Sequence, residues 1–116
     1  MQIVFHIVAR KETENRKSRA YYEPSSLLTE GFIHCSYLHQ VCRVANLFYQ
    51  GQTDLLLMEI DKTKIGCQVI DEDLYDSGET FPHVYGKIPW YAVIAVHEFP
   101  TNEDGTFNLP SSVVAK

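Results

Sequence analysis

Three histidines stand out because each lies in a segment that is otherwise apolar or aromatic: His6, His34 and His83. A polar side chain among apolar neighbours costs free energy unless a partner or a ligand satisfies it. Imidazole titrates near neutral pH, so it can accept or donate a proton during a reaction, and it can also bind metals. The three side chains are therefore candidates for one site, although each alone is also compatible with a structural hydrogen bond.

His34 belongs to the run Gly-Phe-Ile-His-Cys-Ser over residues 31–36. On a strand, residues two apart share a face, so His34 and Ser36 are expected to point the same way and Cys35 into the core. Ser36 is also a good N-cap for a following helix, and the N–H groups at a helix N-terminus attract anions. This combination predicts a site for an anionic or phosphorylated ligand, unless Ser36 only caps the helix and His34 only bonds a backbone carbonyl.

His83 belongs to a second run, Phe-Pro-His-Val-Tyr-Gly, over residues 81–86. In an extended chain Phe81, His83 and Tyr85 share a face, which makes an aromatic wall with a titratable group at its centre. Aromatic side chains beside a histidine can stack on a flat ring, and they also occur in ordinary cores. His83 and Tyr85 are therefore candidate ligand-binding residues.

Glu72 and His6 are weaker candidates when taken alone. Glu72 lies between two aspartates, so it is either a catalytic carboxylate or part of a solvated turn. His6 lies on an apolar face of a predicted strand, where a histidine often has a structural partner. A metal site built from His6, His34 and His83 is an alternative, but no local spacing of ligands requires a metal and none is expected.

Signatures of several common enzyme classes are absent from the sequence. It contains no G-x-G-x-x-G, no G-x-x-x-x-G-K-[ST], no H-E-x-x-H and no G-x-S-x-G motif. This argues against a Rossmann dehydrogenase, a P-loop NTPase, a zincin protease and an α/β-hydrolase.

The composition of the 116 residues is that of an ordinary globular protein, and it predicts a single domain over residues 1–116. Fifteen acidic against ten basic side chains give a formal charge of −5, which argues against broad binding of nucleic acid. The N-terminus lacks the features of a secretion signal, and no stretch approaches the roughly 20 apolar residues of a membrane span. We therefore expect a cytoplasmic protein that makes no membrane contact. Because one core accounts for the apolar stripe of the predicted helix, we also expect a monomer.

Hydrophobic periodicity predicts an α+β fold with one main helix. Its firmest element is a helix that begins at Ser36 and ends at Gly51. A short exposed helix or turn is expected within residues 10–21, and a turn over residues 22–26. The expected strands are residues 2–8, 32–35, 54–60, 66–72, 81–85 and 91–99, with a short final strand after residue 105. The strand over residues 54–60 is apolar on both faces, so it is expected to be central.

These residues resemble the family called domain of unknown function 952, and the resemblance covers nearly the whole chain. The matching positions are His6, residues 22–27, residues 30–36, Gln40, Glu72, residues 81–86 and residues 104–110. The runs over residues 31–36 and 81–86, in that order, are specific to the family. The family is grouped with the ADP-ribosyltransferase-like fold, a small split β-sheet domain that holds NAD in a cleft between two sheets.

The resemblance implies that a nucleotide such as NAD is a substrate rather than a resident cofactor. His6 would bond the ribose on the nicotinamide side, Tyr85 would stack on nicotinamide, and Glu72 would orient the ribose or an incoming nucleophile. The implied catalytic residues are His6, His34 and Glu72, and the implied ligand-binding residues are Ser36, His83 and Tyr85. Cleavage of an N-glycosidic bond passes through an oxocarbenium-like state, for which a carboxylate and donors to the ribose matter most.

Three other functions remain open. The chain is alternatively a non-catalytic module that binds a small molecule or a protein on the same scaffold. A phosphoesterase with paired H-x-S/T motifs fits residues 34–36 only, because residues 6–8 and 83–85 lack the second hydroxyl residue. A metal-dependent hydrolase built on the three histidines is the third alternative.

Overall fold

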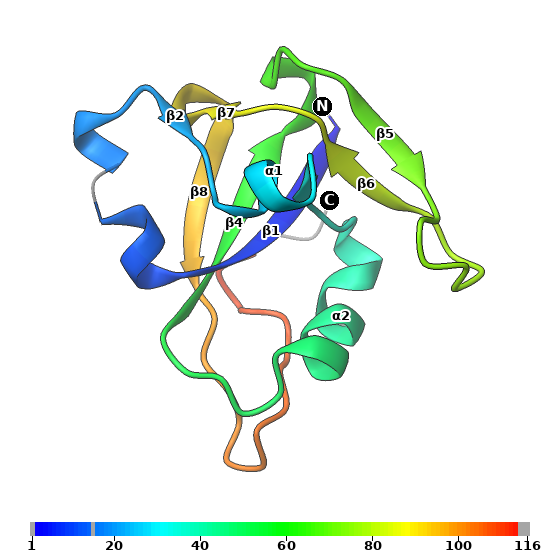
Figure 1. Ribbon diagram of the computed structural model, residues 1–116. Coiled ribbons are helices and arrows are strands. Elements are labelled where there is room, and N and C mark those ends of the chain that lie inside the picture. The colour runs from blue at the N-terminus through cyan, green and yellow to red at the C-terminus, as the bar shows by residue number, and fades with distance from the viewer. Residues whose placement is uncertain (1, 15, 114–116) are drawn as a thin grey trace.

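The computed structural model describes residues 2–14 and 16–113, which form an α+β fold of small antiparallel sheets with few helices. One three-stranded sheet has the order β1-β4-β8, a second has the order β3-β6-β5, and β2 pairs with β7. Figure 1 shows β8, β4 and β1 side by side, with β5 and β6 beyond β1. The strands are β1 (Ile3–Ala9), β2 (Tyr21–Tyr22), β3 (Ile33–His34), β4 (Leu55–Asp61), β5 (Val69–Glu72), β6 (Phe81–Val84), β7 (Ile88–Pro89) and β8 (Val93–Glu98).

The prediction of a central strand over residues 54–60 is confirmed by β4. All seven of its residues are buried, and it pairs with β1 on one side and β8 on the other. Because successive side chains of a strand point to opposite faces, β4 contributes to two separate cores. Leu56, Met58 and Ile60 pack in one, whereas Leu55 and Leu57 pack in the other, against the main helix.

The main helix begins later than the sequence predicts. The α-helix α2 spans Val41–Phe48 and follows a 3₁₀ turn over Leu38–Gln40. Ser36 does not cap it, because the backbone N–H and C=O of Ser36 are bonded to Phe5, at 2.8 and 2.7 Å. Gln40 instead supplies the local cap, since its side-chain oxygen accepts the backbone N–H of Tyr37 at 2.9 Å. The expectation that Ser36 faces a helix N-terminus was therefore wrong.

Other expected elements are present in shorter or altered form. Residues 10–21 contain two 3₁₀ turns, Arg10–Thr13 and Arg16–Ser18, and the predicted turn over residues 22–26 leads directly into the short helix α1 (Ser26–Thr29). The short strand expected after residue 105 is not formed by the residues described up to Val113. Within residues 2–14 and 16–113, no helix is both long enough and apolar enough to cross a membrane.

Candidate functional site

A groove of about 720 Å³ lies between α2, the outer strand β1 and the segment that joins β5 to β6. Its apolar walls come from Phe5 and Ile7 on β1 and from Val44, Leu47 and Phe48 on α2. This volume lies within the range of known small-molecule sites, which are mostly apolar with a few polar groups. The groove therefore has the size and the character of a ligand-binding site.

The polar end of the groove is formed by three residues that the sequence singled out: His34, Ser36 and His83. His34 on β3 lies directly opposite His83 on β6 in the antiparallel pairing, and their ring centroids are 5.4 Å apart. Cross-strand partners on one face are close neighbours, so this register brings together two histidines that are far apart in sequence. Cys35, expected to point only into the core, is buried there and also borders the groove.

His83 and Glu72 form a hydrogen-bonded pair. The Nδ1–H of His83 donates to Oε1 of Glu72 at 2.9 Å, and the hydroxyl of Tyr85 donates to the same oxygen. The bond from Tyr85, followed by that from His83, lowers the pKa of the Glu72 carboxyl, so Glu72 is a carboxylate at neutral pH. The pKa of the Tyr85 hydroxyl is raised, chiefly by its bond to Glu72. The carboxylate thus holds the imidazole in one orientation and one tautomer.

The other ring nitrogen of His83, Nε2, is the one that can accept a proton. With the proton on Nδ1, Nε2 carries a lone pair, and none of the residues described accepts or donates a hydrogen bond there. The imidazole is only 1% exposed, is stacked on Phe32 with ring centroids 4.2 Å apart, and lines the groove. A carboxylate-oriented histidine of this kind is suited to act as a general base.

His34 is held differently, at the outer side of the groove. Its Nε2–H donates to Glu30 at 3.1 Å, and its ring stacks at 6.2 Å on Tyr75, which is 64% exposed. The hydroxyl of Tyr75 also reaches Glu30, at 3.5 Å. The phenol ring of Tyr75 and the imidazole of His34 therefore border the groove within reach of a flat ligand.

Arg43 on α2 is the one Lys or Arg side chain among the described residues that line the groove. It makes an ion pair with Glu79, whose pKa is lowered first by Arg43 and then by Gln40. The Gln40 amide donates to Glu79 and to the carbonyl of Thr80, at 2.9 Å each. The sequence did not point to Arg43 or Glu79, because both lie outside the two runs over residues 31–36 and 81–86.

His6 does not line the groove. It shares a face of β1 with Val4 and Val8, whereas Phe5 and Ile7 face the groove. Its Nδ1–H donates to the carbonyl of His34 at 2.6 Å, and its Nε2 accepts the hydroxyl of Tyr22 at 2.7 Å. Burial of the ring lowers the pKa of His6 to about 4, so the imidazole is neutral near neutral pH. Its contact with the site is indirect, through the backbone of His34.

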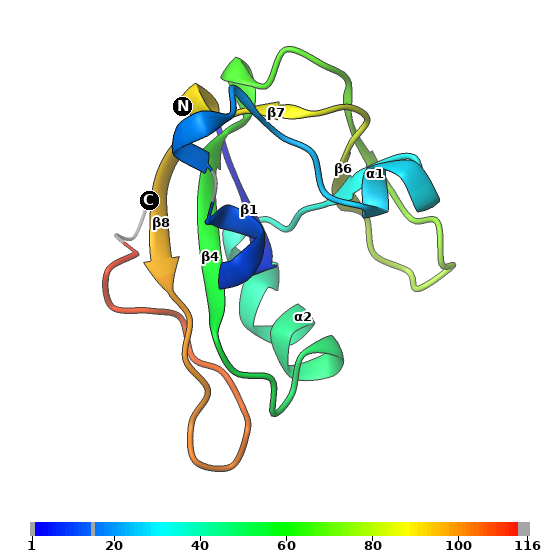
Figure 2. The same cartoon turned by 60° about the vertical axis from the view of Figure 1, so that its left-hand side comes forward.

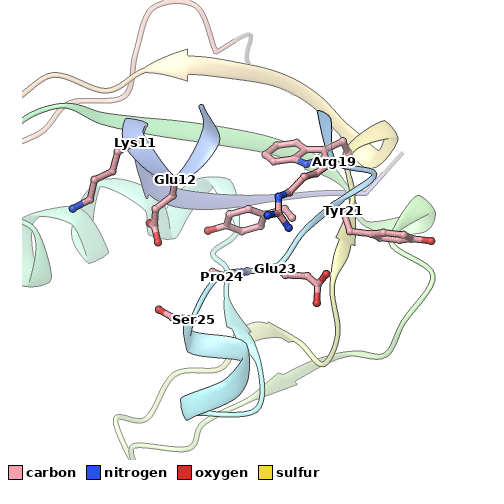
Figure 3. Close-up of a pocket in the computed structure, with 9 residues that line it drawn as sticks. Lys11, Glu12, Arg19, Tyr21, Glu23, Pro24 and Ser25 are labelled. Carbon is pink, nitrogen blue, oxygen red and sulfur yellow. The ribbon is translucent and has the colours of Figure 1, made fainter. Parts of the chain in front are cut away.

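Tyr22 forms part of a smaller hollow of about 330 Å³, on the other side of β1 from the groove. Figure 3 shows its rim, with Lys11 and Glu12 on one side and Arg19 and Glu23 on the other. Tyr22 and Trp90 form its aromatic part, with ring centroids 5.5 Å apart. This hollow carries charges of both signs and contains none of the site residues predicted from the sequence.

The described residues contain no group of three or more His, Cys, Asp or Glu side chains that could hold a metal ion. Of the three histidines, only His34 and His83 meet in one place, and His6 uses both ring nitrogens within the fold. A site that combines the three imidazoles is thus not formed in this part of the chain.

Comparison with known proteins identifies relatives of the same fold. The family model "Protein of unknown function (DUF952)" matches residues 7–96. A crystal structure of protein CC0527 from Caulobacter crescentus is 25% identical, with a TM-score of 0.81, and the match covers 92% of this chain and 94% of that chain. A solution NMR structure of the same protein is 23% identical, with a TM-score of 0.71, covering 91% of each chain. None of the curated proteins matches the chain.

Proposed function

We propose a function for the chain from the premise that it belongs to the DUF952 family of proteins of unknown function. In this proposal the groove binds NAD or another ADP-ribose-containing ligand. Glu72 and His83 then promote cleavage or transfer at the N-glycosidic bond of the ligand. The observation that carries the proposal is the Glu72–His83 pair, because His83 lines the groove and its Nδ1 is held by the Glu72 carboxylate. The likeness to an ADP-ribosyltransferase-like fold is part of the same proposal.

The lining of the groove matches the parts of such a ligand. Flat nucleotide rings are bound by apolar and aromatic walls, which Tyr75, Phe81 and the α2 side chains supply. The guanidinium of Arg43 is suited to bind phosphate oxygens, provided that the ligand displaces part of its contact with Glu79. Ser36 and His34 line the polar end, where the ribose hydroxyls would bind.

The proposed chemistry uses the chain's own proton acceptor. Nε2 of His83 takes the proton of a water or of another hydroxyl as its oxygen bonds to C1′ of the ribose. The C1′–N bond to nicotinamide breaks, and nicotinamide leaves with the electron pair of that bond. Glu72 stabilises the imidazolium that forms, as a carboxylate does for an oriented histidine base. The proton then passes from His83 to solvent.

Occlusion of the groove tests the binding proposal. The variant Val44→Trp places an indole in the groove wall, and we expect it to weaken binding of ADP-ribose at least about tenfold, or ~1.4 kcal/mol. Isothermal titration calorimetry measures the Kd. Leu28→Trp is the matched control, because Leu28 is 93% exposed and lies outside the groove.

The two variants separate the possible outcomes. Loss of affinity in Val44→Trp alone supports a nucleotide site in the groove. Equal affinities for the wild type and both variants would place the ligand elsewhere. If wild-type protein binds ADP-ribose but releases no nicotinamide from NAD, the chain is a non-catalytic module on this scaffold.

A further inference from the structure

A second chain of hydrogen bonds connects three residues that no part of the proposed function uses. The hydroxyl of Ser112 and Nδ1 of His97 are 2.8 Å apart, and Nε2 of His97 lies 2.9 Å from Oε1 of Glu59. A hydroxyl, an imidazole and a carboxylate in this order activate the nucleophile of a serine–histidine–aspartate triad. Here the two ring nitrogens exchange the roles they have in that triad, since Nδ1 of His97 faces the hydroxyl and Nε2 faces the carboxylate.

The fold explains why these side chains meet. Glu59 lies on the central strand β4 and His97 on the neighbouring strand β8, where Leu57 is the direct partner of His97. Residues two apart share a face, so Glu59 and His97 are diagonal neighbours on one face of the sheet. Figure 2 shows the segment after β8 returning along that strand, which brings Ser112 to the pair.

The tautomer of His97 follows from its two partners. A carboxylate only accepts hydrogen bonds, so the proton of a neutral His97 lies on Nε2, which donates to Glu59. Nδ1 then has a lone pair, and the Ser112 hydroxyl donates to it. Glu59 is 3% exposed and His97 8%, whereas Ser112 is exposed. The proton acceptor is therefore buried, and the serine that bears the nucleophilic oxygen is exposed to reagents.

We infer that Ser112 is an activated nucleophile that accepts acyl or phosphonyl groups from activated esters and fluorophosphonates, with His97 as its base. This site differs from the groove, because β8 and β1 are opposite outer strands of one sheet with β4 between them. His97 and Ser112 also lie beyond residues 7–96, the region that the family model matches. The inference does not rest on the proposed nucleotide chemistry.

The reaction with a fluorophosphonate is a balanced substitution at phosphorus. The Ser112 oxygen bonds to phosphorus while the phosphorus–fluorine bond breaks and fluoride leaves. The hydroxyl proton passes to Nδ1 of His97 and then to water. The product carries one phosphonyl group on Ser112, which adds a defined mass to the protein.

Incubation of the full chain with an alkyl fluorophosphonate probe, followed by intact mass and peptide analysis, tests the inference. We expect one adduct per chain on Ser112 and none on Ser112→Ala. Ser111→Ala is the matched control, because this neighbouring serine is also exposed, and it should be labelled like the wild type. His97→Gln should slow labelling at least about 100-fold, because a positioned base contributes roughly 10²–10⁴ to such a rate.

A wild-type protein that remains unlabelled, or that carries the adduct on Ser111, would overturn the inference. Ser112 and His97 would then only fasten the C-terminal segment to the sheet. Thermal unfolding of each variant verifies that it is folded, and the wild-type result decides the question even if His97→Gln does not fold.

Discussion

His83→Gln is expected to reduce the rate of nicotinamide release from NAD by roughly 10²–10⁴, which is the usual contribution of a positioned general base. Glutamine retains a donor for Glu72 but has no nitrogen that accepts a proton near neutral pH. At 1.36 kcal/mol for each factor of ten, this loss amounts to about 3–5 kcal/mol in the activation barrier. A steady-state assay that separates nicotinamide from NAD measures the effect.

His39→Gln is the matched control for this prediction. His39 is exposed and does not line the groove, so its replacement is expected to leave the rate unchanged. Because His83 is buried, a second variant is needed: Glu72→Gln keeps an acceptor for His83 and Tyr85 but removes the negative charge that stabilises the imidazolium. Wild-type rates in both His83→Gln and Glu72→Gln would exclude this pair as the source of the chemistry.

The wild-type protein is expected to lose about 3 kcal/mol of folding free energy, relative to His6→Gln, between pH 7 and pH 4. His6 has a pKa of about 4 in the folded protein, compared with the ordinary value of 6.5. As the pH falls below 6.5, the unfolded chain binds a proton at His6 while the folded chain does not. The stability that the neutral imidazole contributes is therefore complete above pH 6.5 and is lost as the pH falls toward 4.

Urea denaturation at several pH values tests this linkage. The quantity compared is the difference in unfolding free energy between the wild type and His6→Gln. Taking the difference cancels the carboxylates that also titrate in this range, because both proteins contain them. His39→Gln serves again as the control for the loss of one imidazole, since His39 is exposed. Parallel wild-type and His6→Gln curves between pH 7 and pH 4 would show that His6 titrates normally in the folded chain.

The local pattern of apolar and polar residues was sufficient to predict the strands and the helix that form the site, because each of these elements has its own hydrophobic periodicity. The uninterrupted apolar run in β4 indicates burial on both faces, and the alternation along β1 separates His6 from Phe5 and Ile7. The helix start was misplaced because Ser36 has the right chemistry for a cap, but its backbone is already paired with Phe5. A tertiary contact therefore overrode a correct local preference.

The sequence could not show which distant residues pair across strands or form hydrogen bonds with one another. The pairing of His34 with His83 depends on a register between strands separated by more than forty residues, and a shift of one position would turn one imidazole to the other face. The partner of His6 is Tyr22, which lies in a short strand that local patterns read as a turn. No sequence pattern pointed to Ser112, because it reaches His97 only through the segment after β8 that returns along this strand.

An NMR titration of the ¹⁵N-labelled protein with ADP-ribose, observing backbone amides and imidazole rings, tests the central claim most directly. We expect saturable shifts at His34, Ser36 and His83, which line the groove, and at Tyr85, which shares the Glu72 carboxylate with His83. Little change is expected at His97, which lies at the opposite edge of the sheet. Nicotinamide alone is expected to shift a subset of the same signals. No shift at millimolar ADP-ribose, or shifts confined to residues outside the groove, would contradict the assignment of this groove as a nucleotide site.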